Sequence, residues 1–227
     1  MSEELPYKAV LEEAGKRGRV LGREDIYGSG PPVDAVHQEL LEFITKVAGQ
    51  RILDIGCGLG PYMAELNKRG FDCVGVDSNP GVARAAAARG RSVLVMDARA
   101  LAFRDATFDT CLLIEVIEHI HDFELVLRDV ARVARRNIVI SVPNIGAIPI
   151  LSRYNVVPWH LLEATHVNFF TPEILLRALD RVFAGQGKAR VEEYAPFFPW
   201  AEGTQLYYQI RAVVELAPQA RDSSGAG

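Results

Sequence analysis

The sequence predicts an α/β fold of the doubly wound kind, with one mostly parallel sheet covered by helices on both faces. From residue 51 onward, short apolar runs alternate with helix-like stretches, a pattern typical of parallel strands joined by crossover helices. The runs are apolar throughout, which indicates strands that are buried on both faces. A chain of 227 residues is long enough for one domain of this kind.

A helix is expected before the sheet. Apolar residues recur at helical spacing over 36–47, and Gly49 is placed to end the helix. A segment rich in glycine and proline, 27–32, interrupts the helix-like region that precedes it. We therefore expect residues 1–50 to form a helical cap with one break.

Five strand-like runs follow, separated by helix signals. Pro61 opens one helix-like stretch over 61–69, and Asn79 with Pro80 can begin the next, which Gly90 follows. Apolar residues at helical spacing over 123–133 predict a further amphipathic helix, with Arg132, Arg135 and Arg136 near its C-terminal end. The expected strands are 51–55, 73–76, 92–96, 110–114 and 138–142.

The pattern changes after Pro143. Residues 144–170 are apolar and aromatic but have no period, and they are longer than most connections. Thr171 and Pro172 are placed to start another helix. Two closing strands, 191–194 and 205–216, predict an antiparallel hairpin, and 217–227 is expected to be a disordered tail.

The composition indicates an ordinary globular protein. Lys and Arg total 25 against 29 for Asp and Glu, a formal charge of −4, so a nucleic-acid partner is not expected. The three cysteines form no CxxC pair and are expected to be free, buried thiols. The N-terminal residues lack a signal-peptide pattern, and no apolar run approaches the roughly 20 residues needed for membrane insertion. We therefore expect a cytoplasmic location.

The most informative local signal is the segment 54–60, with the sequence Asp-Ile-Gly-Cys-Gly-Leu-Gly, between the first strand and the next helix. Glycines let the backbone approach a ligand closely, and a helix N-terminus offers free N–H groups. The dinucleotide pattern GxGxxG would need glycine or alanine at position 61, where this chain has Pro61. Asp54 would repel a pyrophosphate but suits a cofactor that carries an amino group and a sulfonium.

This segment resembles the first motif of class I S-adenosylmethionine-dependent methyltransferases, and matching features follow in the family's order. Asp77 ends the second strand, Asp97 with Ala98 ends the third, and Phe108-Asp109 opens the fourth. The resemblance covers residues 51–145. It implies a Rossmann-like fold with a seven-stranded, mostly parallel sheet and an antiparallel closing hairpin.

The resemblance also implies a binding site for S-adenosylmethionine within a domain that spans 51–216. Asp54, Gly56 and Gly58 would frame the methionyl part, Asp77 would hold the ribose, and Asp97 with Ala98 would face the adenine. Residues 144–170 would form a lid over the acceptor. The residues expected to contact the cofactor are Asp54, Gly56, Cys57, Gly58, Gly60, Asp77, Ser78, Asp97 and Ala98.

A second cluster follows the fourth strand. If residues 115–121 turn helically, Glu115, Glu118 and His119 share one face. Three interpretations are open at this stage. His119 is a structural histidine among polar lining residues, or His119 is a general base helped by Glu115, or Glu115, Glu118 and His119 bind a divalent metal together with His166.

The spacing Glu-x-x-Glu-His with a distant histidine is similar to the metal ligands of small-RNA 3′-terminal 2′-O-methyltransferases. It is equally similar to bacterial ubiquinone-pathway O-methyltransferases, so the motif does not choose between them. The sequence predicts methyl transfer to an O or N atom of a small-molecule acceptor. An RNA 2′-O-methyltransferase with a metal site and a non-catalytic cofactor-binding protein are the alternatives; the oligomeric state is not predicted.

Overall fold

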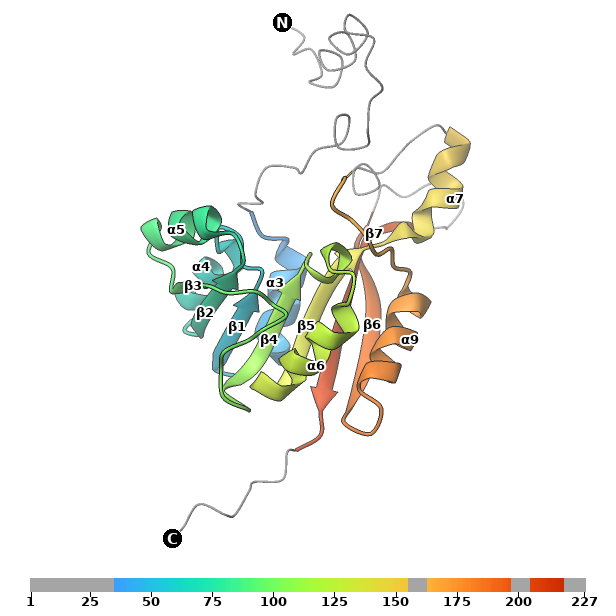
Figure 1. Ribbon diagram of the computed structural model, residues 1–227. Coiled ribbons are helices and arrows are strands. Elements are labelled where there is room, and N and C mark those ends of the chain that lie inside the picture. Colours follow the sequence, from blue (N-terminus) through green and yellow to red (C-terminus); the bar gives the residue numbers. More distant parts are fainter. Residues whose placement is uncertain (1–34, 155–162, 197–204, 219–227) are drawn as a thin grey trace, which may run out of the picture.

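One seven-stranded sheet organises the protein. The structure, a computed structural model, describes residues 35–154, 163–196 and 205–218. The strand order is β3-β2-β1-β4-β5-β7-β6, and β7 runs antiparallel to both of its neighbours (Figure 1). The strands are β1 (Arg51–Ile55), β2 (Asp72–Asp77), β3 (Val93–Val95), β4 (Phe108–Ile114), β5 (Ala134–Pro143), β6 (Gly187–Pro196) and β7 (Tyr207–Leu216). The predicted fold class, including the antiparallel hairpin, is confirmed.

Helices cover both faces of this sheet (Figure 1). Proline lies in the first turn of four of them, and the side chains of Asn79 and Thr171 cap two of these four. The helices are α3 (Gln38–Val47), α4 (Pro61–Lys68), α5 (Pro80–Ala88), α6 (Phe123–Val133), α7 (Ile148–Leu151) and α9 (Pro172–Val182). Short 3-10 helices are η1 (Ile117–His119), η2 (Ile145–Ala147) and η3 (Ser152–Tyr154).

Two apolar clusters hold the layers together. In one cluster, α6 and α9 bury Leu127 and Leu179 against the sheet. In the other, α3 and α4 bury Ile44 and Met63 against the opposite face, and Figure 1 shows these two helices behind the sheet and α6 in front of it. Burial from both sides explains why the central strands are apolar at successive positions. It also makes the sheet a rigid support for its loops.

Several element boundaries differ from the sequence-based prediction. Arg135 and Arg136 were expected at the end of a helix, but they lie in β5, which begins directly after α6. The cause is pairing between Phe108 and Ala134, which starts β4 and β5 earlier than their apolar runs. The third strand is shorter than expected, and β6 starts at Gly187 because its hydrogen bonds to β7 extend beyond its apolar residues. Backbone pairing, rather than side-chain polarity, sets these ends.

Some expectations fall partly outside the described residues. The break at 27–32 and the tail from 219 onward lie outside them, and so does most of the expected cap, of which α3 is described. Residues 155–162 of the expected lid also lie outside, whereas η2, α7 and η3 form its first part. All three cysteines are free and buried, as predicted. Over the described ranges, no helix is long and apolar enough to cross a bilayer.

Candidate active site

The turn between β1 and α4 is built from three glycines in the left-handed region. Gly56, Gly58 and Gly60 have φ values of +68°, +55° and +71°. A Cβ on Gly56 would lie 2.7 Å from Val116, whereas a Cβ on Gly58 would meet nothing within 4 Å. Gly56 is therefore needed for packing as well as for its backbone conformation. Gly58 leaves its side of the turn open.

Asp77, the last residue of β2, ties this turn to the next one. Its carboxylate accepts a hydrogen bond from the backbone N–H of Gly58 at 3.0 Å and another from that of Asn79 at 2.8 Å. Asp97 lies beyond the end of β3, where it forms an ion pair with the exposed Arg99. That hydrogen-bonded ion pair lowers the pKa of Asp97. Both acids thus lie at one edge of the sheet, after adjacent parallel strands.

Asp54 lies beneath the glycine turn. It is 3% exposed, and burial, with a smaller contribution from the charge of Asp77, raises its pKa to about 7. Burial also raises the pKa of the neighbouring Cys57 thiol, which keeps it protonated and unreactive. The turn therefore covers a carboxyl group that has no neutralising cation among the described residues, and a bound cation would favour its ionised form.

Two adjoining clefts open at this edge, and Gly56 and Glu115 line both of them. One has a volume of about 470 Å³, and its lining includes Asp77, Ser78, Asp97, Ala98 and His119. The other has a volume of about 370 Å³, and its lining includes Asp54, Cys57, Gly58, Tyr62, Tyr194 and Gln209. The expected cofactor contacts other than Gly60 are thus divided between two clefts that meet at Gly56 and Glu115, and Gly60 lines neither of them.

Glu115 has an unusual backbone conformation, and its side chain accepts two hydrogen bonds. Its φ of +56° is in the left-handed region, which is strained for a residue with a side chain. Ser141 Oγ donates to its Oε1 at 2.8 Å, and Gln209 Nε2 donates to its Oε2 at 3.3 Å. Burial raises the pKa of Glu115 to about 7, although these two hydrogen bonds act in the opposite direction.

The expectation that Glu115, Glu118 and His119 share a helix face is wrong. The 3-10 helix η1 begins only at Ile117, and the left-handed backbone at Glu115 separates it from that turn. The carboxylate of Glu115 therefore joins Ser141 and Gln209 instead of its neighbours in sequence. Tyr194 extends this network through a 2.6 Å hydrogen bond with Ser141.

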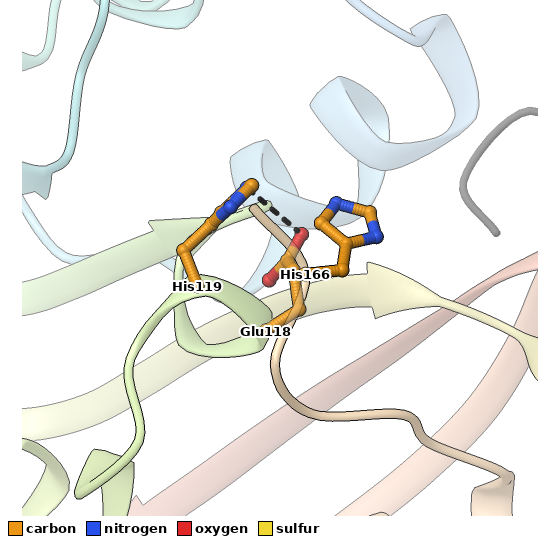
Figure 2. Close-up of side chains that lie close together, drawn as sticks. All are labelled: Glu118, His119 and His166. Carbon is orange, nitrogen blue, oxygen red and sulfur yellow. Dashed lines mark ion pairs between the residues drawn. The ribbon is translucent and has the colours of Figure 1, made fainter. Parts of the chain in front are cut away.

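Glu118, His119 and His166 form the second group of the site (Figure 2). One ligand atom from each lies within 4.8 Å of the others, and the two imidazole centroids are 4.7 Å apart. Glu118 is 1% exposed, and among the described residues neither of its carboxylate oxygens has a hydrogen-bond partner. Its Oε1 is 4.0 Å from Nε2 of His119.

The loop that carries His166 is fastened to η1 by its backbone. The N–H groups of Val167 and Asn168 both donate to the carbonyl of Glu118, at 2.8 and 3.0 Å. The Asn168 side chain donates to the carbonyls of Ile117 and Ile120 at 2.9 and 2.7 Å. These bonds place His166 beside residues that are distant in sequence. They also fix the group without using the side chain of Glu118.

The pKa values of Glu118 and His119 are shifted in opposite directions. Burial, and then the charge of Glu115, raise the pKa of Glu118 well above its usual range. Burial lowers the pKa of His119, opposed by a hydrogen bond to the backbone of Thr165 and the charge of Glu163. Both shifts favour the neutral forms, because desolvation is the largest cause in each case.

Several site residues were not found from the sequence. Ser141 and Gln209 lie within β5 and β7 and look like ordinary strand residues, and Tyr194 looks like an apolar core residue. Glu163 and Thr165 precede His166 in a segment without a period. The sequence offered one indication, which is that Thr165 directly precedes His166, a metal-ligand candidate.

Comparison with known proteins finds a matching family model. Residues 53–141 match the model described as "Methyltransferase domain". This matched segment, which is less than half of the chain, is similar to the class I methyltransferases. S-Adenosylmethionine is the methyl donor of this family. The described fold agrees with that of a SAM-dependent methyltransferase from Archaeoglobus fulgidus, with a TM-score of 0.63 and 19% identity, over 91% of this chain and 99% of that one.

Two curated relatives each match part of this chain. A norajmaline N-methyltransferase from Rauvolfia serpentina is 38% identical over 94 residues, which cover 37% of this chain and 32% of that protein. A ubiquinone biosynthesis O-methyltransferase from Sinorhizobium medicae is 35% identical over 131 residues, 52% of each chain. The chain thus spans about a third of the first relative and about half of the second.

Proposed function

We propose that the protein is an enzyme that transfers the methyl group of S-adenosylmethionine to an O or N atom of a small molecule. The observation that supports this most is the division of the acids between two clefts that meet at Gly56 and Glu115. A donor that is polar at both ends and cationic between them would extend across that junction.

The cleft residues have suitable chemistry for the parts of this donor. Asp77 would accept hydrogen bonds from the two ribose hydroxyls, and Ser78, Asp97 and Ala98 would surround the adenine. The open side of Gly58 leaves room for the methionyl chain, whose ammonium would pair with Asp54. Cys57 and Gly60 complete the turn that carries this part of the site.

The donor supplies an already activated methyl group, so the protein must mainly position the acceptor and accept its proton. In our proposal, Nε2 of His119 takes that proton from an acceptor that lies beside His119, in the part of the larger cleft that the adenosine leaves free. Glu115 lines both clefts and is the second candidate for a base. Burial of Glu115 raises its pKa to about 7, which suits proton exchange near neutral pH.

As the alternative role of His119, we propose that it holds a divalent metal together with Glu118 and His166. The support is the buried Glu118 carboxylate, whose oxygens have no hydrogen-bond partner among the described residues, beside two imidazoles. Buried carboxyl groups ordinarily have partners, and mixed carboxylate and imidazole ligands suit Zn²⁺ or Mn²⁺. A bound divalent ion would supply a positive charge that acidifies an acceptor oxygen. Glu115 is held by Ser141 and Gln209 and would contribute only after leaving them.

The acceptor is proposed to be small and partly apolar. Two relatives are named as a norajmaline N-methyltransferase and a ubiquinone biosynthesis O-methyltransferase, and both names refer to small molecules. An RNA 2′-O-methyltransferase is the second candidate, because the group of Glu118, His119 and His166 would suit a metal-dependent ribose methylation. The formal charge of −4 favours the small molecule, since RNA-binding surfaces are usually basic.

Two measurements test these assignments. Calorimetric titration with S-adenosylhomocysteine, using protein freed of carried-over ligand, should give saturable binding that Asp77→Ala abolishes. Asp72→Ala, at the opposite end of the same strand, should bind normally. Transfer of radiolabelled methyl groups to a metabolite panel and to total small RNA would then separate the two enzyme candidates. Binding without any transfer would favour the third alternative, a non-catalytic cofactor-binding protein.

A cytoplasmic location is also part of the proposal. Three free, buried cysteines are compatible with a reducing compartment. Fractionation of the native cells would test it.

A further inference from the structure

A hydrogen-bonded chain runs away from the active site through the ring of His119. Nδ1 of His119 lies 2.9 Å from Oγ1 of Thr165. The Thr165 hydroxyl donates to Oε1 of Glu163 at 2.9 Å, and the backbone N–H of Thr165 donates to the same oxygen at 3.2 Å. Glu163 is 7% exposed, so this chain of hydrogen bonds leads to a buried carboxylate.

The direction of each hydrogen bond follows from the number of protons available. An ionised carboxylate can only accept, so the single hydroxyl proton of Thr165 is used toward Glu163. Oγ1 of Thr165 then has only lone pairs to offer to the imidazole. Nδ1 of His119 must therefore carry the proton of the neutral ring and donate it to Thr165.

The opposite tautomer would be poorly accommodated. A proton on Nε2 would face Glu118 Oε1 at 4.0 Å, which is beyond hydrogen-bond distance. It would also leave two lone pairs, on Nδ1 and on Oγ1 of Thr165, facing each other. The surroundings of both ring nitrogens therefore favour the same tautomer.

We propose that Thr165 and Glu163 are positioning residues that keep the proton of His119 on Nδ1 and leave the lone pair of Nε2 directed into the site beside Glu118. The tautomer itself follows from the hydrogen bonds, but its effect on catalysis or metal binding rests on the proposed function. A free lone pair on Nε2 is what both a proton acceptor and a metal ligand require. A partner on the far ring nitrogen orients imidazoles in this way in many metal and acid–base sites.

The tautomer can be measured directly. In full-length protein labelled with ¹⁵N on histidine, proton–nitrogen correlation spectra at a pH where the ring is neutral report which nitrogen carries the proton. The signals of His119 are those that His119→Ala removes. We expect the Nδ1–H tautomer in the wild type and a shift toward Nε2–H in Thr165→Val. Thr165→Ser should restore the wild-type pattern.

Thr107→Val is the matched control, since it removes a hydroxyl that donates to the carbonyl of Arg104, away from the site. It should leave the His119 signals unchanged. A wild-type ring protonated on Nε2, or a Thr165→Val spectrum identical to the wild type, would overturn the proposal. If Thr165→Val does not fold, Glu163→Gln replaces it, because an amide can donate to Thr165 and should weaken the Nδ1–H preference.

Turnover and Zn²⁺ affinity provide a second measurement. If the proposed activity holds, Thr165→Val should lower turnover or Zn²⁺ affinity about 10-fold, with recovery in Thr165→Ser. Absence of any activity or metal binding in the wild type, with the Nδ1–H tautomer present, would count against the proposed function and leave the positioning assignment intact. Full activity in Thr165→Val with an altered tautomer would overturn the functional consequence.

Discussion

The carboxylate of Asp77 accepts a hydrogen bond from the backbone N–H of Gly58 at 3.0 Å, which joins the ends of β1 and β2 into one rim. Asp77 therefore has two roles in the proposed site, because it stabilises the glycine turn by a hydrogen bond and also lines the larger cleft. Removing it should affect the turn and the ligand together.

Asp77→Ala should reduce the affinity for S-adenosylhomocysteine at least 100-fold, because about two charge-assisted hydrogen bonds of roughly 1.5–3 kcal/mol each would be lost. Calorimetry measures the change, with Asp72→Ala as the control. Equal affinities in Asp77→Ala and the wild type would mean that the ribose does not lie at the end of β2.

Gly58 and Gly70 offer a matched pair for testing the open side of the turn. Both have positive φ, +55° and +89°, and a Cβ on either would meet nothing within 4 Å. Alanine at either position should cost about 1 kcal/mol of stability, measured by denaturant unfolding. Only Gly58→Ala should also weaken binding of the methyl donor, since its Cβ would enter the cleft. Similar affinities in the two variants would show that no ligand contacts Gly58.

Asp54 should release a proton when the donor binds. Its pKa of about 7 in the free protein means that it is mostly protonated at pH 6, and an ammonium beside it would favour ionisation. Titrations at pH 6 in buffers of different ionisation enthalpy should reveal release of up to about one proton. Affinity should rise as the pH increases toward 7. Asp54→Asn should abolish the buffer dependence, and its absence in the wild type would contradict the pairing.

Burial of Asp54 also affects folding. Because its pKa is raised in the folded state, the unfolded chain loses this proton first, and stability falls as the pH rises from about 4 to about 7. Asp54→Asn should remove that part of the decline. Thermal unfolding of ligand-free protein across this pH range would measure it, and parallel profiles for the variant and the wild type would contradict it.

Glu118→Gln should make the metal-free protein more stable. The variant replaces a buried carboxyl group, whose pKa burial raises well above its usual range, with a neutral amide. The gain should be small near pH 4.5 and larger at higher pH, where ionisation of the wild-type carboxyl is penalised. The same variant should lose any stabilisation by Zn²⁺, and a metal response as large as that of the wild type would exclude Glu118 as a ligand.

His119→Ala should lower turnover by about 100-fold or more, which is the range that general acid–base groups contribute. The affinity for S-adenosylhomocysteine should remain within a few-fold of the wild type, because the proposed role concerns the acceptor. Turnover and binding measured on the same preparation separate the two effects. Unchanged turnover would return His119 to a structural role.

The fold could be predicted because its evidence is local. The apolar runs that became β1, β2 and β4, and the glycines before α4, are visible within short stretches of sequence. The acids Asp77 and Asp97 could be placed at one edge, since parallel strands bring their carboxyl ends together. Strand ends were less predictable, because pairing such as that of Phe108 with Ala134 extends beyond the apolar residues.

The sequence by itself thus determined the doubly wound sheet, the glycine turn and the choice of Asp54, Asp77 and Asp97, because each depends on residues close together in the chain. Only the tertiary structure decided that Glu115 joins Ser141 and Gln209 rather than Glu118. It alone brought Thr165 and Glu163 to the far side of the His119 ring. The physical reason is that hydrogen bonds between segments distant in sequence follow from how loops dock on the sheet edge, and no local periodicity encodes that docking.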